Sequence, residues 1–334
     1  MRPAIKLQGV YMAHGQITVN NAVRYQVTEC RARFEDTHLD ESVLQIIKEE
    51  IGESEESRAA CLEELKNKLL EVKSLDACTE DGFLLAFLRV AKFDVSNAFQ
   101  RVINYYTQHD KLTDAFQNVS MSLDKAKSPR HILASPYRLD NNSILLIGKG
   151  ALDLTKTNIL ERFYLEVVII NSLIKNPLNQ LYGITAIFDY GGFQYNAMLS
   201  YTPRMIHLLV NTLQNSLPLP VKACHIVNLP PLLSSVISIA FALLSKKIKN
   251  RIFIHPSNDG WQSLHKSLPP ELLPEEYGGT LKESGLVDLS DHLDDLEREL
   301  CERFKFGYLK SETQRELLRL NPPINGTKPE EGKN

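Results

Sequence analysis

Five cysteines and nine histidines are the residues best suited to chemistry, and neither set is spaced for a reaction. The cysteines stand at 30, 61, 78, 224 and 301 without a CxxC pair, which suits free thiols in a reducing compartment better than a disulfide framework or a zinc site. The histidines lack metal-ligand spacing. Cys224 and His225 fall in an apolar strand-like run, where a small buried thiol and a satisfied core histidine are expected.

Signatures of common enzymes are also missing. The sequence contains no GxSxG, HExxH, GxxxxGK[ST] or GxGxxG motif. Gly148-Lys149-Gly150 follows a predicted strand and is the nearest imitation of a phosphate-binding loop, but a plain turn is favoured there. We therefore predict a protein that is not an enzyme and that holds no metal and no cofactor.

The composition is that of an ordinary soluble protein, which together with the free thiols predicts a cytoplasmic one. The 334 residues are 43% hydrophobic and 24% charged, with a formal net charge of −3, which argues against a dedicated nucleic-acid partner. The opening MRPAIKLQGV has no apolar run behind a basic head, so no secretory signal is predicted. Residues 226–244 carry no charge over about the length of a membrane span, but Pro230 and Pro231 divide them. A buried strand, a break and a short apolar helix are favoured over a transmembrane helix.

Periodicity along the chain predicts an α/β fold. Residues 39 to about 108 have a helical pattern, with an apolar stripe that runs from Cys61 to Val72 at steps of three and four. Strands and helices then alternate, which predicts a mostly parallel sheet with flanking helices after a small all-helical N-terminal domain. The expected boundaries are a disordered arm at 1–37, the helical domain at 38–120, the sheet domain at 121–285, a C-terminal helix at 286–310 and a disordered tail at 311–334.

The expected elements of the sheet domain follow from the same patterns. They are strands at 131–139, 144–147, 184–190, 221–227 and 251–255, and helices at 157–174, 203–215, 232–247 and 261–268.

Several motifs, in one order, carry a resemblance to a known family. They are LPPELLPEEYGGTL (268–281), DGFLLAFLRVAKFDVSNAFQRVINYY (81–106), GITAIFDYGGF (183–193), ACHIVNLPPLL (223–233) and KKIKNRIFIH (246–255). Together they resemble the CRAL-TRIO lipid-binding family over about residues 40–285, and most closely its branch of tocopherol carriers, retinaldehyde-binding proteins and clavesin-like proteins. The resemblance implies a sheet and helices that wall a hydrophobic cavity closed by a mobile lid.

This resemblance implies a function as well as a fold. It implies an intracellular carrier of one hydrophobic, isoprenoid-like lipid, such as a tocopherol, a retinoid or a carotenoid, that exchanges its ligand at phosphoinositide-containing membranes. A phosphoinositide-binding membrane-trafficking adaptor is the alternative, and an enzyme that acts on a lipid carries low weight. The expected partners are thus a small lipid and, transiently, an anionic membrane surface.

Cavity positions are carried over from the family in the same way. They fall on Phe163, Glu166, Ile170, Ile184, Phe188, Leu213, Leu219, Val221 and Cys224. Nearly all are apolar, as a lipid pocket requires. Glu166 is the exception, because the family residue there is small and neutral; its side chain either reaches solvent or a cation, or contacts a polar end of the ligand.

The predicted lid spans about residues 228–251. Its apolar side chains surround the helix almost completely, so from sequence alone the helix is either wholly buried or moves between a cavity and a lipid surface. The family resemblance favours a lid formed by Val236, Ile239, Ala240, Phe241, Leu243 and Leu244.

Basic residues follow the predicted lid. Positions that match phosphoinositide-binding residues of the family are Lys247 and Arg251, with Lys249 between them. Two further basic positions of the family fall on Ala91 and Pro220 here, and their roles are assigned to the neighbouring Lys92 and Lys222. An anionic membrane suits such a cluster, although cations at an ordinary helix end would show the same local pattern.

Overall fold

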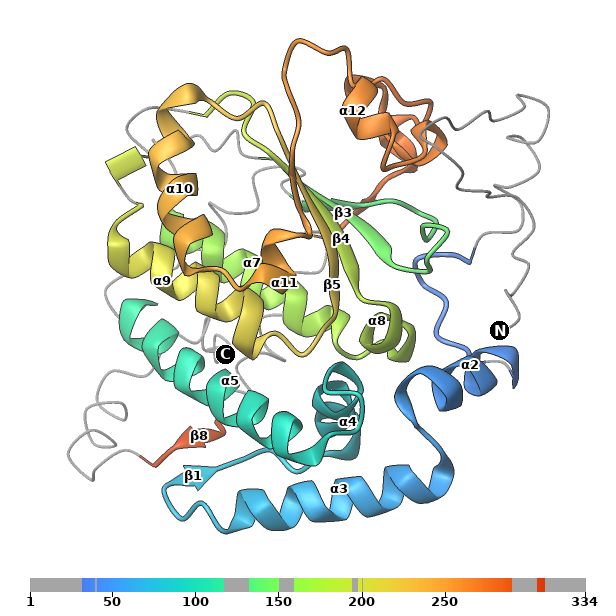
Figure 1. Cartoon of the computed structure of the whole chain (residues 1–334), viewed down its shortest axis with the longest axis vertical. Helices are drawn as coiled ribbons and strands as arrows, with labels where there is room; N and C mark the ends of the chain where they lie inside the picture. Colours follow the sequence, from blue (N-terminus) through green and yellow to red (C-terminus); the bar gives the residue numbers. More distant parts are fainter. Residues whose placement is uncertain are drawn as a thin grey trace, which may run out of the picture.

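A computed structural model describes residues 32–39, 41–116, 132–149, 159–193, 198–199, 201–289 and 305–309. A six-stranded sheet with helices packed against it forms the upper part of the molecule in Figure 1, and a group of N-terminal helices lies below it. This arrangement confirms the predicted α/β class with a mostly parallel sheet and a helical N-terminal region.

Strand order in the sheet is β6-β5-β4-β3-β2-β7. Strands β6, β5, β4 and β3 run parallel to one another. Strand β2 pairs antiparallel with β3 on one side and with β7 on the other. The bounds are β2 Ile132–Ala134, β3 Ile144–Lys149, β4 Ile184–Asp189, β5 Val221–Val227, β6 Ile252–Ile254 and β7 Val287–Asp288.

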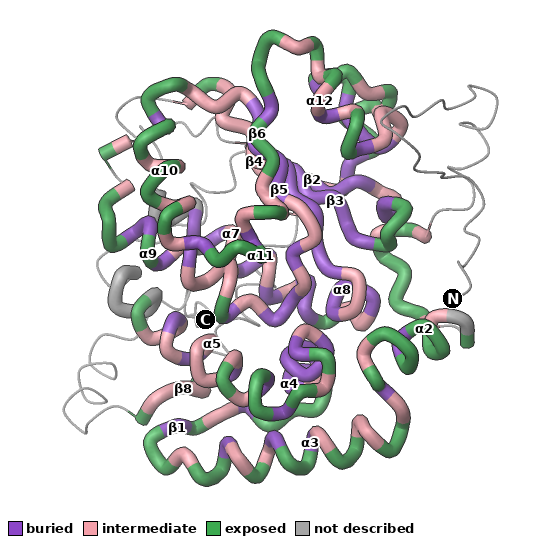
Figure 2. Tube along the Cα trace, in the orientation of Figure 1, coloured by how far each residue is buried: buried purple, intermediate pink, exposed green. Residues whose placement is uncertain are grey.

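Alternate residues of the central strands bury opposite faces of the sheet, as the two-residue period of a strand requires. In β3, Ile144 and Leu146 pack into a core with the helices α7 (Ile159–Leu173) and α9 (Pro203–Asn211). The residue between them, Leu145, packs on the other face with the region around α12 (Gln262–His265). Burial on both faces explains the nearly continuous apolar runs of β3, β4 and β5, which Figure 2 shows as buried.

The turn between α8 (Pro177–Tyr182) and β4 requires a glycine. Asn176 caps α8 by accepting a hydrogen bond from the Leu178 amide, and proline occupies the first helical position. Gly183 then has a φ of +70°, and a Cβ there would lie 1.8 Å from the carbonyl oxygen of Pro220. Only glycine allows this close approach between the start of β4 and the residue before β5.

Among the described residues of the N-terminal part there are four helices, α2 (Glu41–Ile51), α3 (Glu55–Leu70), α4 (Asp81–Val90) and α5 (Val95–Phe116). Ser54 caps α3 through a reciprocal pair of hydrogen bonds with Ser57. The apolar stripe of α3 packs with α4 and α5 around a separate core, whose fully buried members include Leu65, Leu84, Phe87, Leu88 and Val102.

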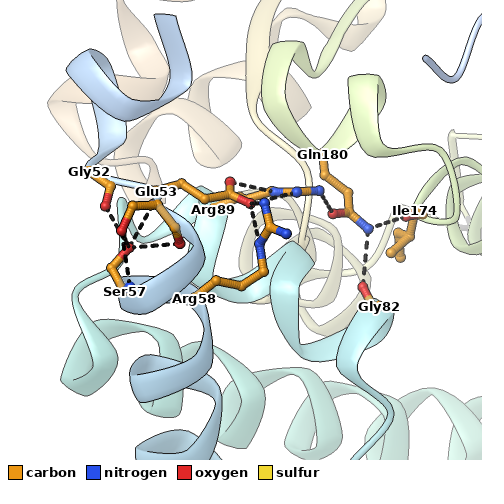
Figure 3. Close-up of polar contacts among 9 residues, drawn as sticks. Gly52, Glu53, Ser57, Arg58, Gly82, Arg89, Ile174 and Gln180 are labelled. Carbon is orange, nitrogen blue, oxygen red and sulfur yellow. Dashed lines mark hydrogen bonds and ion pairs between the residues drawn. The ribbon is translucent and has the colours of Figure 1, made fainter. Parts of the chain in front are cut away.

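A buried polar network joins this helical core to the sheet region (Figure 3). Glu53, just before α3, accepts hydrogen bonds from Arg89 of α4 at 2.9 and 2.7 Å. Arg89 also donates to Gln180 of α8, whose amide nitrogen donates to the carbonyl oxygens of Gly82 and Ile174. The side chains of Glu53 and Arg89 are only 1% and 5% exposed, so their charges are largely shielded from water. Arg58 approaches Glu53 from the solvent side at 2.9 Å.

The last residues of the predicted N-terminal arm contact the sheet region. Arg33 forms a β-bridge with Tyr137, and the Phe34 amide donates to the carbonyl oxygen of Pro136 at 2.8 Å. Residues 1–31 of that arm and the predicted tail at 311–334 lie outside the described residues.

The predicted C-terminal helix at 286–310 lies mostly outside the described residues too. Its described ends are extended: β7 pairs with β2, and β8 (Gly307–Tyr308) pairs antiparallel with β1 (Leu75–Asp76) of the helical part. Strands of two residues leave no periodicity in the sequence, because only their backbone pairing defines them.

Two predicted helices end earlier than expected. The helix expected at 203–215 ends as α9 at Asn211 and continues as a π-helical turn, Thr212–Ser216. The helix expected at 232–247 is divided into α10 (Ser234–Leu243) and α11 (Lys246–Lys249). Ser245 is extended and its hydroxyl accepts a hydrogen bond from the Ile248 amide, so this residue caps a new helix instead of continuing the old one.

Candidate functional site

A cavity of about 340 Å³ lies between the sheet and the helices α5, α7, α9 and α10. Strands β4 and β5 form one wall, with Ile184, Phe188 and Ile226 among their contributions. The lining is mostly aliphatic and aromatic, and the volume falls within the range of small-molecule sites. Such a cavity can exclude water from a hydrophobic guest.

The structure places most of the predicted cavity residues in this wall. Seven of the nine line the cavity, namely Phe163, Glu166, Ile170, Ile184, Phe188, Leu213 and Cys224. The other two, Leu219 and Val221, are 2% and 4% exposed and belong to the packed core, not to the cavity wall. Both pack in the same core as Ile184 and Cys224, at the end of the sheet where β5 begins beside Ile184. Contact of the seven with a ligand stays a prediction.

Two residues of the cavity wall, Cys224 and Glu166, carry groups that could react with or bind a ligand. Burial raises the pKa of Cys224 to about 12, so its thiol stays protonated near neutral pH and is a poor nucleophile. Glu166 is half-buried and already interacts within the protein.

The apolar helix of the predicted lid lies on the surface. None of the residues of α10 is buried, which excludes the alternative of a wholly buried core helix. Among the predicted lid residues, Ala240, Phe241 and Leu244 line the cavity, whereas Val236 and Leu243 pack beside α9. Ile239 is 46% exposed. One apolar helix thus faces the cavity on one side and solvent on the other.

A hydrogen-bonded group holds the base of this segment. Asn228, with a left-handed φ of 52°, begins the segment and donates to Asp189 at the end of β4 at 2.8 Å. Tyr277 of the EYGG motif donates to the other oxygen of Asp189, also at 2.8 Å. The two glycines of that motif are needed because Gly278 has a φ of +67° and a Cβ on Gly279 would lie 1.9 Å from the Leu273 carbonyl oxygen. The motif is therefore structural and, through Asp189, fixes the beginning of the lid segment at Asn228.

The Gly148-Lys149-Gly150 sequence is also structural where it is described. Lys149 forms an ion pair with Glu276 at 2.8 Å, which ties the end of β3 to the EYGG motif. A lysine paired in this way is not presented to a phosphate. The predicted plain turn is wrong at Gly148 and Lys149, because backbone pairing with β4 continues strand β3 to Lys149; Gly150 lies outside the described residues.

Cationic side chains from four separate segments lie close together. Burial lowers the pKa of Lys247, and the neighbouring charges of Arg251, Arg101 and Lys92 lower it further. Burial likewise lowers the pKa of Lys222, with further lowering by Arg251 and Lys92 and an opposing effect of Glu50. We call Lys92, Arg101, Lys222, Lys247 and Arg251 the basic cluster.

Sequence reasoning missed one member of this basic cluster. Arg101 lies on α5 with no basic neighbour in sequence, so only the packing of α5 beside the lid exit brings it in. Lys249, which was predicted with the others, is half-buried on α11 and is not among the charges that shift the pKa of Lys222 or Lys247. Within the described ranges, no carboxylate forms an ion pair with any of the five cations. Their mutual repulsion is a physical reason for the cluster to take an anion.

On the face of the sheet away from the cavity, two buried histidines share a hydrogen bond. His225 Nδ1 lies 2.9 Å from His255 Nε2, and His255 Nδ1 lies 2.9 Å from the Ser263 hydroxyl. Burial, followed by the charge of His255, lowers the pKa of His225 to about 4. The pair is a satisfied core contact, as expected for His225 from its place in an apolar strand.

This pair predicts a loss of stability in mild acid. His225 is neutral in the folded protein down to about pH 4, whereas in the unfolded chain it takes up a proton below its ordinary pKa of about 6.5. The unfolded state thus binds more protons, and stability falls as the pH drops. We expect about 2 kcal/mol less stability from this group at pH 5 than at pH 7. Urea unfolding at both pH values should show a smaller drop for His225→Leu; equal drops would contradict the assignment.

Across its described residues, the chain has no helix that is both long and apolar enough to cross a bilayer. The apolar cavity and the apolar helix that covers it define a class of protein that encloses a hydrophobic molecule.

Comparison with known proteins agrees with this class. Residues 135–279 match the CRAL/TRIO domain. The mouse protein named "Alpha-tocopherol transfer protein-like" is 30% identical over 248 residues, covering 73% of this chain and 72% of its own length. The human protein of that name is 29% identical over 271 residues and 79% of both chains. Rat "Clavesin-1" is 30% identical over 208 residues, 61% of this chain and 58% of its own.

Among solved structures, that of Sfh5 aligns with 75% of this chain and 99% of its own at 14% identity, with a TM-score of 0.40. The sequence relatives decide the identification: the chain belongs to the CRAL-TRIO family of lipid-binding and lipid-transfer proteins.

Proposed function

We propose that this protein is a non-enzymatic carrier. It holds one isoprenoid-like lipid, such as a tocopherol, a retinoid or a carotenoid, in the cavity and exchanges it at phosphoinositide-containing membranes. The main support for this proposal is the apolar cavity of about 340 Å³, which the exposed apolar helix α10 closes. The protein would be cytoplasmic and would attach to membranes peripherally and transiently.

Two features of the site support carriage over catalysis. The wall offers apolar contact on most sides, which favours a hydrophobic guest by removing its surface from water. The thiol of Cys224 is held protonated by burial, so it is unsuited to attack a bound lipid. The human and mouse relatives named alpha-tocopherol transfer protein-like are consistent with a lipid cargo.

Exchange at a membrane would use both the lid helix and the basic cluster. Leu232, just before α10, is 40% exposed, and Ile239, on α10, is 46% exposed. These side chains can enter the acyl-chain boundary of a bilayer while Lys247 and Arg251 face anionic headgroups. Opening of the helix at the surface would then expose the cavity to lipid instead of to water.

The basic cluster also favours a second function, that of a phosphoinositide-binding adaptor in membrane trafficking. In that case the headgroup is a membrane address, and the cavity serves a secondary role.

Lipid extraction from the purified protein tests the proposal, and the variant Phe188→Ala tests whether the lipid is held by the cavity wall. Phe188 is half-buried at the cavity wall, so truncation should remove ligand contacts while costing less than about 2 kcal/mol of fold stability. Protein purified from cells should carry a neutral lipid near one per chain, identified by mass spectrometry, and the variant should retain several-fold less.

The matched control is Phe87→Ala, the same substitution in the helical core. Phe87 is 0% exposed and lies away from the cavity wall, so it should lose about 3–5 kcal/mol of stability. Its remaining folded protein should keep the lipid. Co-purified phosphoinositide without a neutral lipid would favour the adaptor, and equal lipid retention by Phe188→Ala would place that ring in ordinary core.

A further inference from the structure

The polar side chains in the cavity wall are mostly engaged with the protein itself. Tyr105 donates its hydroxyl hydrogen to Asn171 Oδ1 at 2.9 Å, and Asn171 donates to the carbonyl oxygen of Val167 at 2.8 Å. Thr212 donates to the Leu208 carbonyl oxygen at 2.9 Å, and Ser216 donates to that of Asn211 at 3.2 Å. The hydrogens of these groups are already donated within the protein, so none of these polar atoms lacks a hydrogen-bond partner.

Gln108 differs from them. It lies on α5, lines the cavity and is only 7% exposed. Its side-chain oxygen Oε1 is buried, and within the part of the chain that the structure describes it accepts no hydrogen bond. A buried amide oxygen without a donor costs free energy, and native proteins rarely retain one without a reason. A donor supplied by the ligand would satisfy it.

The position of α5 relative to the lid gives the ligand a direction. Both α5 and α10 contact α9, and Figure 1 shows them on opposite sides of it. Gln108 thus enters the cavity from the side of the helical N-terminal part, away from α10. A polar group bound there leaves the apolar remainder of the ligand along the wall towards the lid.

We propose that Gln108 is the acceptor for a hydroxyl at one end of the bound lipid. This inference rests on the proposed carriage of an isoprenoid-like lipid and narrows it to lipids with a neutral donor. A hydroxyl fits because it supplies the hydrogen that Oε1 lacks at a small desolvation cost, whereas an ionised end would pay heavily in an apolar cavity. Hydrocarbons and ethers of the same shape leave Oε1 unpaired and bind less tightly.

Retinol and retinyl methyl ether form a suitable pair of probes, because they share the fluorescent polyene and differ in the hydroxyl hydrogen. Titration of lipid-free full-length protein should show that the wild type prefers retinol by about threefold to tenfold. Gln108→Met keeps the length of the side chain and removes the acceptor, so the preference should fall to about one. The thermal midpoint should stay equal or rise, since the buried unpaired oxygen is gone.

Thr212→Val is the matched control. It also removes a polar group from the wall, but one that already donates to Leu208, so the preference for retinol should persist. Equal binding of the two probes by the wild type, or an unchanged preference in Gln108→Met, would overturn the assignment while leaving lipid carriage intact. Failure of both probes to bind the wild type would count against carriage of isoprenoid lipids and against this inference together.

Discussion

Replacing Glu53 by leucine is expected to lower the free energy of unfolding by about 3–5 kcal/mol, the usual cost of breaking a buried ion pair from one side. Arg89 is 5% exposed and would keep a positive charge without its carboxylate. A guanidinium cannot release its proton to relieve that cost. Arg89 could still donate its hydrogen bond to Gln180, so α4 would stay in contact with α8. The contact would then contain a buried positive charge with no carboxylate to neutralise it.

Urea unfolding of Glu53→Leu beside Glu64→Leu measures this effect. Glu64 is exposed on α3 and pairs only loosely with Lys68 at 3.7 Å, so the same substitution there should change stability by less than about 1 kcal/mol. The double variant Glu53→Leu with Arg89→Met should recover much of the loss, because no buried charge is left unpaired. Equal effects of Glu53→Leu and Glu64→Leu would mean that the network contributes no more than a surface pair.

Reversing two charges of the basic cluster is expected to reduce binding to anionic vesicles by about a hundredfold or more at low salt. Each cation near such a surface contributes on the order of 1 kcal/mol, and each reversal also adds a repulsive charge. Lys92→Glu with Lys247→Glu is the suitable variant, because both side chains are exposed. Arg251 is less suitable, since it also donates to the Val221 carbonyl oxygen.

Sedimentation with vesicles that contain phosphatidylinositol bisphosphate gives the measurement. Lys73→Glu with Lys266→Glu is a control of equal net charge, because both lysines are exposed and neither belongs to the basic cluster. This control should bind nearly as well as the wild type, and the difference between the two double variants should shrink as salt is added. If both double variants lose affinity equally, net charge alone drives binding and the cluster has no specific role.

Local patterns in the sequence were sufficient for the fold class and most central elements. The apolar runs at 144–147, 184–190 and 221–227 correspond to β3, β4 and β5 within a few residues, because a strand buried on both faces needs apolar residues throughout. Several motifs in one order, that around EYGG among them, indicated the family. The EYGG motif is the one whose structural role can be given in detail. Its physical basis emerged only with the contact of Tyr277 to Asp189 and the left-handed turn at Gly278.

Other features depended on the tertiary structure. The helix at 234–243 is apolar apart from three serines, a sequence that suits a buried or an exposed helix, and only its packing on α9 placed it at the surface. Arg101 and Gln108 are ordinary polar positions of an amphipathic helix until the crossing of α5 sets one beside Lys247 and the other in the cavity wall. Periodicity reports which face of an element is apolar. Which distant side chains meet is decided by register and packing between elements, and a local pattern carries no record of them.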